Sequence, residues 1–238
     1  ASINDGSWTG QGQNPLEWLE NNPLRYKKYK MISTVFADLT LYRNLVFRSQ
    51  FAVDFSHTTG FSQSFPDYEP NLGEGSAARS STDGLGLHLT NTLTYRFDKD
   101  NVHDFNFLLG HEWQDYHLEA FSVSTAGQTN SKLTDISTGT RATSWTSTAD
   151  SDYSRVSFFG RGEYNYADRY YAEVSVRTDG SSRFGKNNRW GVFGAVGFMW
   201  NLRNENFMAG TRDWLTMSQV AFSSGTSGNS EIPNYEHL

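Results

Sequence analysis

The stretch VRTDGSSRFGKNNRWGVFGAVGFMW, residues 176–200, decides how the rest of the chain is interpreted. Its centre is polar, and its second arm alternates large apolar residues with small ones, as at Val192, Val196 and Phe198. A Trp stands near each end of that arm, at Trp190 and Trp200. This spacing matches the roughly 9–11 residues of a tilted transmembrane strand with aromatic residues at both interfaces. We therefore expect two neighbouring strands joined by an external polar loop.

The same period of two recurs along the chain, and it indicates half-apolar strands. It is clearest in four segments: Leu45–Ser56, Leu85–Phe97, His103–Gln114 and Arg155–Tyr166. Four more strands are expected with less regular alternation: Met31–Tyr42, Tyr170–Thr178, Trp190–Leu202 and Trp214–Ser223. Short helical turns are expected at Pro15–Asn21 and Asn204–Met208, and no helical period is sustained elsewhere.

The connections alternate between short and long, as they do in outer-membrane barrels with tight periplasmic turns and long external loops. The expected short turns are Arg43–Asn44, Asp98–Asn101 and Ala167–Arg169. The expected external loops are His57–Gly84, His117–Tyr153 and Asp179–Arg189, the last turning at Gly180 through a positive φ angle. The sequence thus predicts an all-β fold: an antiparallel transmembrane β-barrel with about eight strands here and long extracellular loops.

The composition agrees with a barrel that has a wet interior. The 238 residues are only 37% hydrophobic but 15% aromatic, with 21 Gly and 5 Pro. The chain has no cysteine, which excludes disulfides and thiolate metal sites. A net charge of −6 argues against nucleic-acid binding, because phosphate neutralisation needs a basic surface.

The sequence motifs that resemble metal-binding sites lack residues that such sites require. In HEWQDYH, residues 111–117, the position four residues after His111 is Asp115 rather than the second His of a zinc-peptidase helix. Asp98–Asp100 begins like a calcium loop, but Val102 and His103 occupy positions that need an oxygen ligand and a Gly. We expect no catalytic residue, no metal site, no cofactor and no enzyme activity.

The charged residues of the predicted strands form the candidate site. On the face opposite the apolar one they would line the barrel lumen, either contacting a polar cargo or plug, or pairing with each other across strands to keep a wet wall solvated. The second explanation is favoured for any single residue. The lumen-facing candidates are Arg48, Asp54, Arg96, Glu112, Arg161, Glu163, Glu173 and Arg177.

A family resemblance runs through nearly the whole chain. RTDGSSRFGKNNRWGVF, residues 177–193, resembles the SusC/RagA family of TonB-dependent outer-membrane transporters, most specifically at DGSSRFG. Further segments resemble the same family in the same order: NPLEWLENN, LVFRSQFAVDF, NTLTYRF, FGRGEYNYADRYY, ENFM and WLTMSQVAFSSGTSGNSEIPNYEHL.

The resemblance implies a plugged barrel of about 22 strands, of which residues 1–238 would supply an interior slice without the plug and the C-terminal strands. It implies import of glycan or peptide nutrients across the bacterial outer membrane, energised through TonB. It also implies a SusD-like surface lipoprotein as partner, besides substrate and lipid bilayer.

Two other functions remain open at this stage. A self-contained eight-stranded barrel could act as a small pore or anchor, with an interior filled by side chains. A soluble β-sandwich lectin or adhesin is disfavoured, because apolar runs on four strands would form an exposed apolar patch.

Overall fold

The fold is known from a computed structural model, which describes residues 15–67, 74–145, 149–185, 189–211 and 213–228. The elements follow each other in this order: α1 (Pro15–Asn21), β1 (Leu24–Tyr42), β2 (Leu45–Ser64), β3 (Gly75–Lys99), β4 (His103–Gln128), the 3₁₀ helix η1 (Ile136–Thr138), β5 (Arg141–Trp145), β6 (Ala149–Tyr166), β7 (Tyr170–Ser181), β8 (Trp190–Asn201), the 3₁₀ helices η2 (Leu202–Asn204) and η3 (Asn206–Thr211), and β9 (Gln219–Gly225). The described residues are thus nearly all β, as the sequence predicts.

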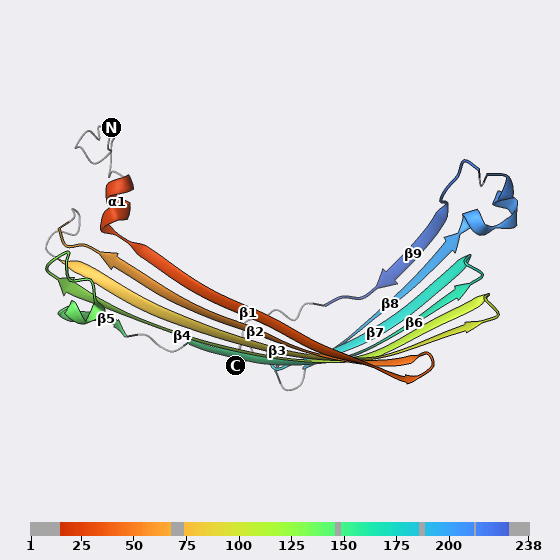
Figure 1. The fold of residues 1–238 in the computed structure, drawn as a ribbon, viewed down its shortest axis with the longest axis horizontal. Coiled ribbons are helices and arrows are strands. Elements are labelled where there is room, and N and C mark those ends of the chain that lie inside the picture. Colours follow the sequence, from red (N-terminus) through yellow and green to blue (C-terminus); the bar gives the residue numbers. More distant parts are fainter. Residues whose placement is uncertain (1–14, 68–73, 146–148, 186–188, 212, 229–238) are drawn as a thin grey trace. The chain divides into compact units, whose positions relative to one another are not determined.

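The strands form one sheet in which chain neighbours are sheet neighbours. The order is β1-β2-β3-β4-β6-β7-β8-β9, and β5 pairs with β4 off this path (Figure 1). The printed pairings are antiparallel, with Glu163 opposite Glu173 on β6 and β7, and Val174 opposite Val196 on β7 and β8. Within the described residues β1 and β9 are the ends of the order, so the sheet is not closed.

The short turns are where the sequence places them. Asp100 and Asn101 between β3 and β4, and Ala167 and Asp168 between β6 and β7, all have φ between 52° and 59°. Two consecutive positive φ angles match the turn type that suits the twist of a hairpin. The Ala167 N–H donates to the Val102 carbonyl at 2.7 Å, so the two turns lie side by side.

The expected external loops are partly strand. β2 continues to Ser64 and β3 begins at Gly75, inside the segment expected to be a loop from His57 to Gly84. β4 extends over 26 residues to Gln128, far beyond Gln114. The prediction stopped where the regular alternation of apolar and polar residues stopped, but backbone pairing does not need that alternation. At the other end, β9 begins at Gln219 and not at Trp214, so the last expected strand was placed too early.

The expected turn at Gly180 is also wrong. Gly180 is a strand residue, opposite Val156 on β6 and Trp190 on β8. A Cβ added at Gly180 would lie 2.9 Å from the Trp190 ring, so this glycine leaves room for an indole rather than a reversal. Among the described residues the only glycine with a positive φ is Gly127.

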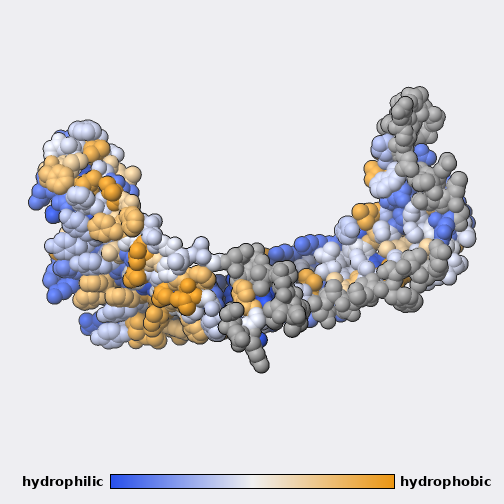
Figure 2. Space-filling model, turned by 180° about the vertical axis from the view of Figure 1, so that it is seen from behind, coloured by the Kyte–Doolittle hydropathy of each residue, from blue (hydrophilic) through white to orange (hydrophobic). Residues whose placement is uncertain are grey.

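The chain divides into two compact units. The first comprises residues 1–31, 54–85 and 117–151, and the second comprises residues 32–53, 86–116 and 152–238. In the described part of the chain, Ala77 and Ala126 are the only buried hydrophobic residues. Most large apolar side chains are exposed, and in the view of Figure 2 they gather on the second unit, while the first unit is mostly hydrophilic.

Candidate functional site

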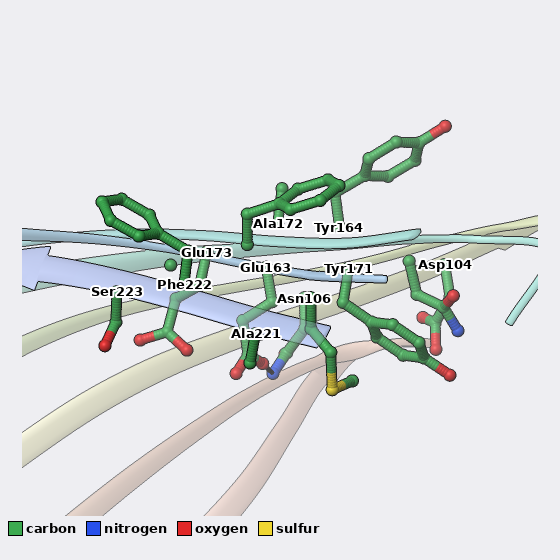
Figure 3. Close-up of a pocket in the computed structure, with 14 residues that line it drawn as sticks. Asp104, Asn106, Glu163, Tyr164, Tyr171, Ala172, Glu173, Ala221, Phe222 and Ser223 are labelled. Atoms are coloured by element: carbon green, nitrogen blue, oxygen red, sulfur yellow. Dashed lines mark hydrogen bonds between the residues drawn. The ribbon is translucent and has the colours of Figure 1, made fainter. Parts of the chain in front are cut away.

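The polar face of the second unit carries the site, and strand alternation produces it. Figure 3 shows Glu163, Glu173 and Asn106 on one side of the strands, and Tyr164 and Phe222 on the other. These residues belong to the lining of a shallow depression of about 480 Å³ formed by β4, β6, β7, β8 and β9. Because adjacent side chains in a strand point to opposite faces, charged residues two positions apart share one side.

Arg161 is the centre of the first cluster on this face. Its guanidinium binds Glu163 on the same strand and donates to Glu173 Oε2 on β7 at 3.0 Å. The Asn106 amide donates to the second oxygen of Glu163 at 2.6 Å. Glu163 and Glu173 face each other directly in the register, so the arginine offsets the repulsion between two opposed carboxylates.

Arg177 is the centre of a second cluster. Its Nη2 donates to Glu112 Oε2 at 2.6 Å, and its Nε donates to Asp179 Oδ1 at 2.7 Å. The guanidinium also lies over the Phe159 ring, 5.3 Å from its centroid, and so within the reach of about 6 Å over which a cation and an aromatic ring attract each other. Two carboxylates and one ring therefore fix the position of this arginine.

The remaining candidates form simple pairs. Arg48 donates to both oxygens of Asp38 at 2.6 and 2.7 Å, and Arg96 donates to Asp104 at 2.7 and 3.3 Å. In the first unit, Lys30 Nζ lies 3.0 Å from Asp54. Each of the eight predicted residues is thus paired with a charge of opposite sign, and their place on a lumen wall stays a prediction.

Sequence reasoning missed several partners in these pairs. Asp38 lies in β1, where alternation is poor, and Asp179 was assigned to a loop. Their positions carried a usable signal, because Asp179 is two residues from Arg177 and so shares its face. Nothing in the sequence indicated that Asp38 would lie opposite Arg48.

The apolar face carries a row of aromatic rings beside the short turns. Neighbouring ring centroids are 4.7 to 6.4 Å apart along the row, the range in which aromatic pairs attract one another. In order, the row comprises Phe97, Phe105, Tyr164, His103, Tyr166, Tyr170, Trp200 and Phe207. It crosses β3, β4, β6, β7 and β8 and reaches η3.

Glu205 binds the polar ends of this row. Its Oε1 accepts from the Tyr170 hydroxyl at 2.6 Å and from the Trp200 indole N–H at 3.0 Å. Arg169 lies 3.8 Å from its other oxygen. The two hydrogen bonds, with the Arg169 charge as a smaller contribution, hold the pKa of Glu205 below its ordinary value. The connection between β8 and β9 is therefore fastened to the aromatic row by an ionised carboxylate.

The motifs set aside above have structural roles. His111 packs against Phe158 at 5.1 Å, whereas Glu112 on the opposite face binds Arg177. Asp98 accepts from the Asn101 N–H at 3.1 Å within the hairpin turn. Over the described ranges, no group of three or more His, Cys, Asp or Glu residues is placed to hold a metal ion. No helix in that part of the chain is both long and apolar enough to cross a membrane.

Known proteins that are similar in sequence to this chain are TonB-dependent receptors. No family model matches the chain. The chain is 28% identical over 244 residues to TonB-dependent receptor P26 of Formosa agariphila, covering 97% of the chain and 24% of that receptor. It is 35% identical over 107 residues to TonB-dependent receptor SusC of Bacteroides thetaiotaomicron, covering 45% of the chain and 10% of SusC.

Solved structures agree with the sequence matches. The RagAB peptide transporter superimposes with a TM-score of 0.85 and 31% identity, over 92% of this chain and 25% of that one. The present chain therefore spans about a quarter of the length of receptor P26 and of the matched RagAB chain. With a single antiparallel sheet and similarity of both sequence and fold, the chain matches a segment of the SusC/RagA type of TonB-dependent transporters.

Proposed function

We propose that residues 1–238 are part of one TonB-dependent-receptor barrel domain in the bacterial outer membrane, which imports glycan or peptide nutrients. The matched segment covers only 24% of the first relative's length. In this proposal the plug and the C-terminal strands are supplied by other parts of the protein. The proposed partners are the TonB complex, acting through the plug, and a SusD-like surface lipoprotein. No enzyme activity, cofactor or metal is part of the proposal.

The observation that carries the proposal is the apolar face of the second unit. Val192 and Val196 on β8 are 70% and 52% exposed, and Leu109 on β4 is 62% exposed. Leaving such a side chain in water forgoes roughly 1.5–3 kcal/mol relative to burying it. A face made of many of these residues requires an apolar environment, and lipid supplies one without a protein partner.

The dimensions of β8 fit a bilayer. Trp190 and Trp200 bound its apolar face and are ten residues apart. At roughly 3.3 Å per residue and a tilt of about 45°, they are separated by about 23 Å along the membrane normal, close to the apolar band of about 25 Å in outer-membrane barrels. The aromatic row beside the short turns then lies at one interface.

The opposite face is the proposed lumen wall. Its eight charged candidates are paired within the wall, so a wet interior can be lined without isolated charges. Orientation follows from the connections: the short turns face the periplasm, and the long strand extensions and their loops lie outside the cell. β3 and β4, at 25 and 26 residues, exceed by more than twofold the roughly 9–11 residues that a bilayer requires.

The substrate class is tested by uptake. RagAB is described as a peptide transporter, and this supports peptides for the present chain as well as the glycans implied by its resemblance to SusC. Cells carrying the intact gene, a gene deletion or a TonB deletion are given labelled oligopeptides and oligosaccharides. Uptake of one class should disappear in both deletions. Uptake that survives either deletion refutes active import by this protein.

The assignment of faces is tested by labelling, for which the absence of cysteine gives a clean background. Single cysteines at Val196 and at Ala195 differ only in the face they occupy. In cells, a membrane-impermeant thiol reagent should leave Val196→Cys unlabelled, while Ala195→Cys reacts once the outer membrane is made permeable. Equal labelling of both would contradict a lipid-facing strand.

The alternative, a self-contained small barrel acting as pore or anchor, predicts different behaviour of the isolated chain. In the described structure β1 and β9 do not pair with each other, and lipid cannot satisfy the backbone groups of an open edge. The purified 238-residue chain should therefore aggregate or stay unfolded in detergent. A heat-resistant and protease-resistant monomer in micelles would favour the small barrel.

A further inference from the structure

A basic depression of about 410 Å³ lies in the first unit, outside the site described above. Three cations line it: Arg25 and Lys27 on β1, and Arg79 on β3. Phe61 and Phe65 add apolar surface, so charged and apolar groups share one hollow. None of these residues belongs to the ion pairs of the proposed lumen wall.

The depression has an excess of positive charge. Arg79 lies over the Phe61 ring at 5.0 Å and 3.7 Å from Asp135, an ion pair at the outer limit of distance. Hydrogen bonds from Ser137, and to a smaller extent the Arg79 charge, lower the pKa of Asp135, so this carboxylate remains ionised. Among the described residues neither Arg25 nor Lys27 has an ion-pair partner. One carboxylate therefore faces three cations.

The depression opens on the same strand face as the apolar residues. Two sets of contacts within the first unit show which residues share a face of the sheet. Odd-numbered residues meet on one side, where Tyr29 stacks on His57 and His57 binds Asp83 at 2.5 Å. Even-numbered residues meet on the other side, where Lys30 binds Asp54.

The three cations are odd-numbered, as are the apolar residues further along the same strands. Within the first unit these are Phe55 on β2 and Leu85 on β3, both of them exposed. On each strand the apolar positions thus give way to polar ones and then to the basic depression. A membrane leaflet has the matching order, with apolar acyl chains followed by charged headgroups.

We propose that the basic depression binds the phosphate-bearing headgroup of a lipid with a net negative charge, in the leaflet beside the barrel. The cations attract the phosphate, and the apolar residues further along the same strands, Phe55 and Leu85, contact the acyl chains. A free anion would gain from the cations alone and makes no contact with these apolar residues. The inference rests on the proposed function, since it needs the odd-numbered face to be directed toward lipid.

The test compares neighbouring lysines of opposite face. Lys27→Gln removes a cation from the depression, and Lys28→Gln removes the same charge from the other side of β1. The whole transporter containing this segment is purified in detergent with phosphatidylglycerol or phosphatidylcholine, and retained lipid is counted by native mass spectrometry. Inorganic phosphate is added as competitor in a parallel series.

The protein should retain phosphatidylglycerol in preference to phosphatidylcholine. Each cation near a membrane surface is worth about a fivefold change in affinity, so Lys27→Gln should weaken retention about fivefold, and Arg25→Gln/Lys27→Gln about 25-fold. Lys28→Gln should leave it unchanged. Equal retention of both lipids, an equal loss in Lys28→Gln, or displacement by inorganic phosphate as effective as by lipid overturns the proposal.

Flotation of the same samples with liposomes separates the two proposals. If the protein floats with vesicles but shows no lipid preference, the headgroup site is refuted and the transporter assignment stands. If the protein does not associate with vesicles at all, both are refuted.

Discussion

The assignment of the two strand faces predicts a depth-dependent cost for a charge on β8. The decisive change is Val196→Arg. Val196 lies opposite Val174 in the register, and both are more than half exposed. Val192→Arg places the same charge on the same face nearer the end of the strand, and Ala195→Arg places it on the polar face.

The expected magnitudes follow from the positions of the two tryptophans. The midpoint between Trp190 and Trp200 falls next to Val196. At roughly 3.3 Å per residue and about 45° of tilt, Val196 lies about 2 Å from the midplane along the membrane normal, and Val192 lies about 7 Å from it. Val196→Arg should therefore lower the free energy of unfolding from lipid by about 2–4 kcal/mol, and Val192→Arg by about 1 kcal/mol or less. Ala195→Arg should cost less than Val196→Arg, because its side chain reaches water.

The assay is equilibrium unfolding by urea in vesicles of defined lipid, using the whole transporter that contains this segment. A difference of about 2–4 kcal/mol corresponds to roughly 30- to 900-fold in the folding equilibrium. The order of cost should be Val196, then Val192 and Ala195. Equal losses at Val196 and Ala195 would refute the face assignment, and equal losses at Val196 and Val192 would refute the placement of the bilayer.

Three further predictions concern topology, packing and pH. An epitope tag inserted near Gly127 should be stained by antibody on intact cells and one near Asp100 should not, and the reverse pattern would invert the orientation. Gly110→Ala should destabilise the fold by about 1–3 kcal/mol, because the new Cβ would overlap the Phe159 ring, and shrinking that ring with Phe159→Leu should restore part of the loss in thermal unfolding. The pKa of Glu205 is lowered in the folded state, so its contribution to stability is present above the unfolded pKa of about 4.3 and is lost as the pH falls through the folded pKa. The melting temperature of Glu205→Gln should therefore depend less on pH in that acidic range than the melting temperature of the parent. Identical pH profiles of the two proteins would exclude this role.

The sequence determined the local features of the sheet. Alternation of apolar and polar residues predicted the strands around Leu89, Phe107 and Phe158, because the face that a side chain occupies in a strand depends only on whether its residue number is odd or even. The hairpin turn at Ala167–Arg169 was predicted from its position between two such runs. The eight charged candidates were selected for the same reason, since the polar face is the complement of the apolar one, and their role in a lumen stays a prediction.

Only the tertiary structure decided features that involve two strands or more. Arg48 pairs with Asp38, and Arg161 joins Glu163 to Glu173, because the register sets which residues are opposite. An odd or even residue number gives the face of a side chain but not the residue opposite it on the neighbouring strand. Strand length beyond the apolar zone was also hidden, as in β4, because backbone hydrogen bonds sustain a strand whose side chains carry no period.

Gly180 shows the limit most clearly. In the sequence it follows Asp179 in a polar segment and is typical of a turn. In the structure the indole of Trp190, on the neighbouring strand, lies where a Cβ at Gly180 would be. The local sequence gives the conformations that a glycine can adopt. Its actual conformation is set by a residue ten positions away, which is brought beside it only when β7 and β8 pair.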